Sequence, residues 1–282
     1  MEYAWSDIIT RINNPMEIFK LLPGTNCRDC NEKTCMAFAV AVFKNRKQLD
    51  KCPHLTPDIL EAYGGETEKP NTIEEDMRQA VENLKGMIPG TDLAEAAKRT
   101  GGKFDGKKLT LKVLGKDFSI ATDGMLSSDI HINPWLAAPV LHYVLHCKGA
   151  PLSGNWITFR ELKGGMERYA LYRQRCENPL KKIADSYTDL FKDMLDIFNG
   201  KRVKGPIDSD VAIILHPLPL VPIIIAYLEP EEGMESSLHI FYDQTAEQNL
   251  DIDSLYTLTA GMVIMLDKIA QRHGIASART IA

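Results

Sequence analysis

The feature that most constrains this chain is a cluster of cysteines near its N-terminal end. Their spacing is C-x2-C-x4-C-x16-C, and they are Cys27, Cys30, Cys35 and Cys52. The chain starts without the basic residues and apolar stretch of a secretory signal, so we expect a reducing, cytoplasmic setting. There, clustered cysteines indicate metal ligation rather than disulfide bonds, because thiols stay reduced. The other two cysteines, Cys147 and Cys176, are scattered, and we expect buried apolar side chains there.

Local sequence around the cysteines bears on which metal they bind. Thr34 and the apolar run after Cys35 predict a helix over residues 34–49, capped by Thr34 and with a thiolate in its first turn. The partial positive charge and free amides of a helix N-terminus stabilise such an anion. Pro53 follows the fourth cysteine, as in the Cys-Pro endings of ferredoxin cysteine runs. A structural zinc site more often has two C-x2-C pairs, and this chain has one. The spacing favours a 4Fe-4S cluster, with a zinc site and unligated cysteines as alternatives.

A longer motif surrounds the cysteines. Residues 21–39 read Leu-Leu-Pro-Gly-Thr-Asn-Cys-Arg-Asp-Cys-Asn-Glu-Lys-Thr-Cys-Met-Ala-Phe-Ala, and a Cys-Pro pair follows at residues 52–53. This motif resembles the small iron-sulfur domain at the N-terminus of the large subunit of corrinoid iron-sulfur proteins. In that family the domain holds a low-potential 4Fe-4S cluster that reductively reactivates a bound cobalt corrinoid. The resemblance implies the ligand role for Cys27, Cys30, Cys35 and Cys52.

The chain departs from that family at three positions and after the motif. Arg28, Asp29 and Asn31 stand in turns where glycines are common in the family, so the cluster potential and the docking surface do not carry over. The resemblance covers about the first 65 residues. The family continues into a TIM barrel of about 250 residues, for which this chain has neither the remaining length nor eight strand-helix units.

The rest of the chain has a second resemblance. Residues 141–162 and 218–227 read Leu-His-Tyr-Val-Leu-His-Cys-Lys-Gly-Ala-Pro-Leu-Ser-Gly-Asn-Trp-Ile-Thr-Phe-Arg-Glu-Leu and Leu-Pro-Leu-Val-Pro-Ile-Ile-Ile-Ala-Tyr. From Gly102 onward the chain resembles an uncharacterised family of anaerobe proteins, known only as a domain of unknown function. The iron-sulfur module is frequently N-terminal to that domain. This second resemblance names no chemistry.

Composition excludes several classes of protein. Hydrophobic residues make up 44% and charged residues 25% of the 282 residues, which is enough apolar material for a folded core. The formal net charge of -5 argues against a nucleic-acid partner, because phosphate binding needs a basic surface. No apolar run approaches the roughly 18 to 20 residues of a membrane helix, so we expect no membrane partner. The longest candidate, residues 211–228, is interrupted by three prolines.

The chain divides into two predicted domains. Residues 64–71 are polar and contain glycine and proline, which is typical of a linker. We therefore predict an iron-sulfur domain over residues 1–65 and a domain of unknown function over residues 66–282. Apolar residues at helical spacing predict several helices, with a break at Pro179 in one of them: 4–20, 72–85, a helix from Asp92, 134–147, 166–198 and 253–273.

Five segments of the second domain have strand patterns. Residues 109–113 and 118–121 alternate apolar and polar around a short turn, which predicts a hairpin. Three more strands are predicted over 210–215, 221–227 and 238–242. Their connections are too short for crossover helices, so antiparallel pairing is favoured. The sequence predicts an α+β fold: a small helical iron-sulfur domain, then a larger domain with a mostly antiparallel sheet and flanking helices.

Two further groups of residues are candidate binding sites. His142 and His146 lie four residues apart on one predicted helix, so their imidazoles share a face on which a metal, a heme iron or the cobalt of a corrinoid could bind. Packing or hydrogen bonding is the alternative. Arg160, Gly164 and Gly165 belong to a glycine-containing loop before a predicted helix, a place where an anion can bind. An ordinary glycine turn is the alternative. No Ser-His-Asp or Cys-His dyad can be named from spacing.

These observations favour one function over two others. We expect an electron-transfer protein whose cluster delivers low-potential electrons to a redox partner protein. The resemblance suggests a corrinoid or a corrinoid protein as the acceptor, or a ligand bound by the second domain. The first alternative is a redox enzyme acting on a small organic substrate in the second domain. The second is a binding module with a structural zinc ion.

Overall fold

The computed structural model describes residues 14–44, 46–63, 73–187 and 189–272. Cα packing divides the chain into an N-terminal unit, Met1–Ile73, and a C-terminal unit, Glu74–Ala282. The predicted linker at residues 64–71, with the domain boundary after residue 65, lies outside the described residues, so that boundary stays a prediction.

The N-terminal unit is a small helical fold. Its elements are α1 (Pro15–Leu21), α2 (Cys35–Phe43), the 3₁₀ turn η1 (Leu49–Lys51) and α3 (Pro57–Tyr63). α1 packs against α2. Phe38 and Ala39 of α2 lie with Ile18 of α1 in a core that also contains two of the clustered cysteines. Of the first predicted helix, residues 4–13 lie outside the described residues.

The cluster helix is shorter than the sequence predicts. Its N-cap is confirmed, because the Thr34 side chain accepts a hydrogen bond from the Ala37 amide. The prediction that it runs to residue 49 is wrong: α2 ends at Phe43, and the amides of Arg46 and Lys47 bond back to the carbonyl of Ala41. The Lys47 Nζ donates to the Cys30 carbonyl at 2.8 Å and lies 2.9 Å from Glu32. Contacts with the cysteine loop therefore replace the last turns of the helix.

The C-terminal unit contains two antiparallel sheets. The four-stranded sheet has the order β1-β2-β3-β4, and the five-stranded sheet has the order β5-β9-β8-β7-β6. The strands are β1 (Lys103–Phe104), β2 (Lys108–Val113), β3 (Lys116–Ala121), β4 (Leu126–Ser128), β5 (Trp156–Thr158), β6 (Lys201–Arg202), β7 (Val211–Leu218), β8 (Val221–Leu228) and β9 (Ser237–Asp243). The antiparallel α+β prediction is confirmed. The predicted hairpin is also confirmed, with positive φ at both turn residues, Leu114 and Gly115.

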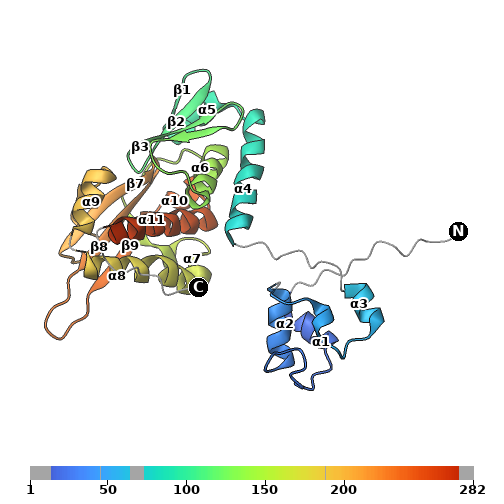
Figure 1. Cartoon of the computed structure of the whole chain (residues 1–282). Coiled ribbons are helices and arrows are strands. Elements are labelled where there is room, and N and C mark those ends of the chain that lie inside the picture. The colour runs from blue at the N-terminus through green and yellow to red at the C-terminus, as the bar shows by residue number, and fades with distance from the viewer. Residues whose placement is uncertain (1–13, 45, 64–72, 188, 273–282) are drawn as a thin grey trace. The chain divides into compact units, whose positions relative to one another are not determined.

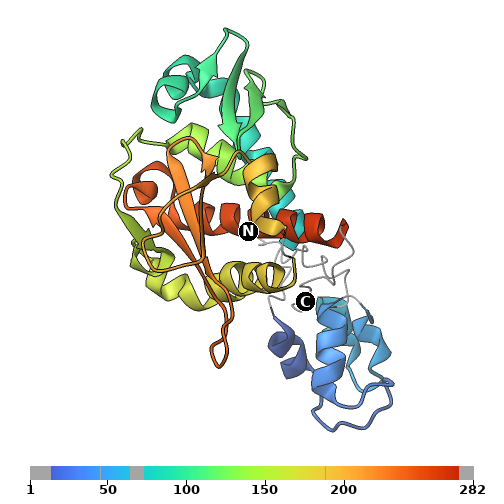
Figure 2. The same ribbon diagram turned by 90° about the vertical axis from the view of Figure 1, so that its left-hand side faces the viewer.

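Helices enclose the core of the C-terminal unit. In chain order they are α4 (Ile73–Met87), η2 (Ile88–Gly90), α5 (Leu93–Thr100), α6 (Pro134–His146), η3 (Phe159–Glu161), α7 (Gly165–Tyr172), the π turn η4 (Arg173–Glu177), α8 (Asn178–Ser186), α9 (Leu190–Ile197), α10 (Ala246–Asn249) and α11 (Ile252–Arg272). α11 lies across one face of the five-stranded sheet (Figure 1 and Figure 2) and packs on α6 and α8. Alternate strand residues on that face, such as Ile225 and Ile240, belong to the large core.

The helical segment around Pro179 differs from the prediction. Pro179 does not break it, because the chain is helical without interruption from Gly165 to Ser186, where α8 ends, and α9 begins at Leu190. The amide of Asn178 bonds to the carbonyl of Arg173, five residues back, so the turn before Pro179 is a π turn. Pro179 comes directly after this π turn, and it lacks the N–H that would otherwise bond to a carbonyl of the preceding turn.

None of the described helices combines the length and the apolar character that a membrane span requires.

Candidate metal centre

The cysteine loop is shaped by residues in the left-handed backbone region. Asn26, Arg28 and Asn31 have φ values of 53°, 70° and 59°. Asn26 also fixes the third cysteine: its Oδ1 accepts a hydrogen bond from the Cys35 amide at 2.7 Å, and its own amide donates to the Cys35 Sγ at 3.4 Å. An N–H···S contact of this kind stabilises negative charge on a sulfur ligand. The start of α2 and the loop before it therefore hold Cys35 from both sides.

The four clustered cysteines differ in exposure. Cys27 is exposed, Cys30 is half-buried, and Cys35 and Cys52 are buried, with 6% and 5% of their surface accessible. Burial raises the pKa of the Cys52 thiol, and the nearby thiols of Cys30, Cys27 and Cys35 raise this pKa further by charge repulsion. The structure therefore brings all four thiols within electrostatic range of one another. Their roles as ligands stay a prediction.

The spacing of the sulfur atoms can be compared with that of a zinc site. Among the described residues, one group of three or more metal-binding side chains has its ligand atoms all within 4.8 Å of one another, and that group is Cys27, Asp29 and His54. No three of the four cysteine sulfurs are that close together. A tetrahedral zinc site with Zn–S bonds of about 2.3 Å would place its sulfurs about 3.8 Å apart. In the described residues, the sulfurs are therefore not as close together as a tetrahedral zinc site would hold them.

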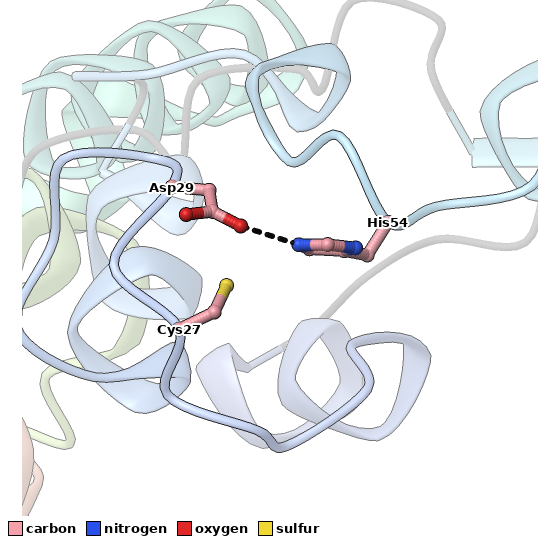
Figure 3. Close-up of side chains that lie close together, drawn as sticks. All are labelled: Cys27, Asp29 and His54. Carbon is pink, nitrogen blue, oxygen red and sulfur yellow. Dashed lines mark hydrogen bonds and ion pairs between the residues drawn. The ribbon is translucent and has the colours of Figure 1, made fainter.

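A carboxylate and an imidazole lie at the exposed rim of this site (Figure 3). His54 Nε2 lies 2.7 Å from Asp29 Oδ2, and both side chains lie beside Cys27. Hydrogen bonds, first from His54 and then from Cys27, lower the pKa of the Asp29 carboxyl. Neither Asp29 nor His54 is predicted as a site residue from the sequence. The signal for them was their position, since Asp29 lies between the first two cysteines and His54 lies two residues after the fourth. This trio could itself hold a metal ion, but it shares Cys27 with the four-cysteine set.

The predicted histidine pair lies on α6 in the C-terminal unit. The rings of His142 and His146 have centroids 4.4 Å apart and are tilted by 50°. His142 Nδ1 lies 2.9 Å from Asp251 Oδ2, and neither atom has another partner among the described residues. A carboxylate on one ring nitrogen is the usual support for a metal-binding histidine, but it also satisfies a purely structural one. Burial, followed by the charges of His142 and Arg99, lowers the pKa of the exposed His146. The roles of His142 and His146 stay predictions.

The predicted anion loop has its own internal partners. Gly164 has a φ of 76°, and a side chain on Gly165 would collide with the carbonyl of Phe159, so both glycines are needed by the backbone. The Lys163 amide donates to Glu247 Oε2 at 2.7 Å, and the Gly165 amide donates to the carbonyl of Leu162. Arg160 is exposed. Anion binding by Arg160, Gly164 and Gly165 stays a prediction, and the geometry gives these glycines a structural role.

Two family models match the chain in separate places. Residues 92–265 match the family described as "Domain of unknown function (DUF3786)". Residues 22–54, which contain all four clustered cysteines, match the Fe-S cluster family. Both resemblances expected from the sequence are thereby confirmed. The match to the domain of unknown function starts ten residues before Gly102, the position expected from the sequence.

Curated relatives match only a short part of the chain. The acetyl-CoA decarbonylase/synthase complex subunit gamma of Methanothermobacter thermautotrophicus is 49% identical over 43 residues, 15% of this chain and 9% of the relative. The corresponding subunit of Methanosarcina acetivorans is 47% identical over 45 residues, 16% of this chain and 10% of the relative. The corrinoid/iron-sulfur protein large subunit of Moorella thermoacetica is 40% identical over 47 residues, 17% of this chain and 10% of the relative. The match thus spans about a tenth of the length of these relatives. No solved structure matches the chain.

Proposed function

From the premise that this chain belongs to the DUF3786 family and also carries an Fe-S cluster module, we propose that it is an iron-sulfur electron-transfer protein. Its N-terminal unit would hold a 4Fe-4S cluster on Cys27, Cys30, Cys35 and Cys52. The observation that carries this proposal is the convergence of these four thiols, since the other three raise the pKa of Cys52 by charge repulsion and all four lie in the segment that matches the Fe-S cluster family.

The surroundings of the thiols support a redox role. Cys35 and Cys52 are buried in the apolar core of the N-terminal unit, and a dry environment with N–H···S contacts is one of the means by which a protein sets a cluster potential. Cys27 is exposed, so one side of the site is open to a partner. Electron transfer between proteins needs such an approach and uses small, transient interfaces.

The acceptor is proposed from the relatives. Several of them are named as subunits of the acetyl-CoA decarbonylase/synthase complex, and one is named as a corrinoid/iron-sulfur protein. We infer that the reduced cluster gives one electron to a corrinoid, either on a separate corrinoid protein or bound by the C-terminal unit. The cluster is oxidised by one electron and the cobalt is reduced by one electron. No atom is transferred.

Anaerobic reconstitution with iron and sulfide tests the cluster. We expect a broad absorbance at about 400 nm that bleaches with dithionite, because sulfur-to-iron charge transfer is lost on reduction. Cys30→Ser and Cys35→Ser should lose iron. Cys176→Ala is the matched control, since Cys176 is a fully buried thiol of the C-terminal unit. A colourless protein that binds stoichiometric zinc, or unchanged iron in both serine variants, would refute the proposal.

Mixing with hydroxocobalamin tests the acceptor. Dithionite-reduced protein, freed of excess reductant, should reduce the cobalt from Co(III) to Co(II) while the cluster absorbance recovers. If the C-terminal unit holds the corrinoid, the hydroxocobalamin spectrum should also shift on binding to oxidised protein, and His142→Ala should weaken that shift. Reduction without a binding shift would place the corrinoid on a separate protein. No reduction at all would exclude a corrinoid acceptor.

A further inference from the structure

A cavity of about 620 Å³ lies in the C-terminal unit, outside every site considered above. It is lined by the π turn η4, the start of α8 and the first residues of β9. Small-molecule sites in proteins usually have volumes of about 300 to 1,000 Å³. The cavity is therefore large enough for a ligand of nucleotide size or smaller.

One wall of the cavity is the edge of β9. β5 pairs with β9 only at residues 241–243, so no described strand covers the same edge at residues 237–240. The Ile240 amide at this edge donates to Glu177 Oε1 at 3.3 Å, and Tyr169 Oη donates to Glu177 Oε2 at 3.5 Å. Glu177 is 4% exposed, and burial raises the pKa of its carboxyl. A buried carboxyl group thus lines the cavity and bonds to the edge of β9 beside it.

The outer part of the cavity carries positive charge. Arg173, Lys181, Lys182 and His239 line it, opposed by Glu177 and Glu235. Lys181 is paired with Asp185 at 3.1 Å. Arg173 and Lys182 are exposed, and neither side chain has a hydrogen bond or ion pair with the residues that the structure describes. Two cations without a hydrogen bond or ion pair to the described residues therefore line a cavity that also contains a buried carboxyl group, whose pKa burial raises and the charge of Arg173 lowers.

The π turn places these groups. Arg173 and Glu177, its first and last residues, both line the cavity, whereas Arg175 in the middle of the same turn does not. A π turn is less stable than an α-helical one, and such turns are frequent at functional sites. Here the wider turn brings Glu177 against the open edge of β9.

We propose that this cavity binds a small organic anion, with its carboxylate or phosphate group between Arg173 and Lys182 and a hydrogen-bond donor facing Glu177. This goes beyond the proposed electron transfer and does not depend on it, because no cysteine of the cluster takes part. Charge-assisted hydrogen bonds to two cations supply the affinity, and the buried carboxyl group with the β9 edge selects ligands that carry donors.

Isothermal titration of the whole chain tests the proposal, with AMP as the phosphate probe and citrate as the carboxylate probe. We expect one saturable site for at least one probe at millimolar concentration or below. Arg173→Gln and Lys182→Gln should each weaken binding by about tenfold, the effect of losing one charge-assisted hydrogen bond. Arg175→Gln, which removes an exposed cation from the same turn but outside the cavity, should leave the affinity within about twofold.

The result of the titration shows whether the cavity binds a phosphate or a carboxylate, or that the proposal is wrong. Binding of AMP alone identifies a phosphate ligand, and binding of citrate alone identifies a carboxylate ligand. Absence of saturable binding for both probes overturns the proposal. If Arg175→Gln weakens binding as much as Arg173→Gln and Lys182→Gln do, the proposal is also overturned, because the affinity would then depend on net charge rather than on the cavity. Circular dichroism confirms that the variants are folded, and the cluster absorbance is read separately, so failure here leaves the electron-transfer proposal unaffected.

Discussion

At the scale of single residues, the cysteine loop carries backbone strain at Arg28, which has a positive φ value. Arg28 and Asn31 have positive φ values, and these are positions where we expected glycines to be common. Asparagine tolerates this region, but for arginine it costs about 1 to 2 kcal/mol. The sequence alone marked these residues as departures, and their conformation explains why glycine suits two of the three positions.

Arg28→Gly should therefore stabilise the loop. Relief of strain exceeds the roughly 0.5 to 1 kcal/mol that glycine costs in chain entropy, so we expect a gain of about 0.5 kcal/mol. Asp29→Gly is the matched control, because Asp29 is not among the residues with positive φ and loses its contact with His54. Hydrogen exchange of peptides from residues 14–44 measures both variants. Lower protection in Arg28→Gly than in the unaltered chain would contradict the strain argument.

A second residue-scale prediction concerns Asp251. Its Oδ1 accepts the amides of Asp253 and Ser254 at the start of α11, while its Oδ2 lies beside His142. Burial alone would raise the pKa of Asp251, but hydrogen bonds from His142 and Ser254 outweigh burial and hold it well below 3.8. Because the pKa is lowered by folding, the ionised Asp251 carboxylate stabilises the folded state above pH 3.8. This stabilisation is lost as the pH falls through the folded-state pKa.

Asp251→Asn keeps the helix cap, since asparagine also accepts amides there, and removes only the charge facing His142. The variant should be less stable at pH 7 by about 0.5 kcal/mol, the scale of a partly exposed ion pair. Urea unfolding at pH 7 and pH 3 measures the difference, which should shrink at pH 3. A difference of equal size at both pH values would show that the charge makes no contribution.

At the scale of elements, the predictions succeeded where the sequence carries a local signal. Thr34 and Asp92 begin α2 and α5 as N-caps, and the β2–β3 turn has the residues and length of a tight hairpin. The end of α2 depends instead on Lys47 reaching Cys30 across the loop. β5 and β6, with three and two residues, were missed because they exist only by pairing with β9 and β7. The π turn was missed because one widened turn leaves apolar spacing almost unchanged.

Glu177 was missed as a site residue for the same reason, and its variants test how the π turn meets β9. The pKa of Glu177 is raised, so its favourable contribution is present below pH 4.5 and is lost as the pH rises through the folded-state value. Glu177→Gln keeps an acceptor for the Ile240 amide without the charge. It should be more stable than the unaltered chain at pH 7, and the difference should disappear at pH 4.

Glu177→Ala is the contrasting variant. It leaves the Ile240 amide without its acceptor, and an unsatisfied buried donor costs about 1 to 3 kcal/mol. The urea concentration at the midpoint of unfolding, measured at pH 7 and pH 4, ranks the stability of the unaltered chain, Glu177→Gln and Glu177→Ala. If Glu177→Gln and Glu177→Ala are equally less stable than the unaltered chain at pH 7, the charged Glu177 carboxylate stabilises the fold at that pH. This result would contradict the argument from burial.

At the scale of the whole molecule, the core of the N-terminal unit and the large core of the C-terminal unit share no described residue. One contains Ile18, Phe38 and the buried cysteines of the N-terminal unit, and the other joins the helices and sheets of the C-terminal unit. The sequence predicted this separation from the linker composition and from the position of the cysteines. It could not predict the cavity beside η4, because Arg173 and His239 are brought together only by the packing of α8 on β9.

Separate cores predict that the metal stabilises one unit only. A core as small as that of the N-terminal unit rarely suffices for a stable fold without a metal or disulfides. Removing iron from reconstituted protein with a chelator should therefore abolish hydrogen-exchange protection in peptides of α2 and η1. Peptides of β8 and α11 should keep theirs, since every proposed ligand lies before residue 53. Loss of protection in both units would show that the C-terminal core depends on the metal, and full retention in α2 would show that the N-terminal unit folds without it.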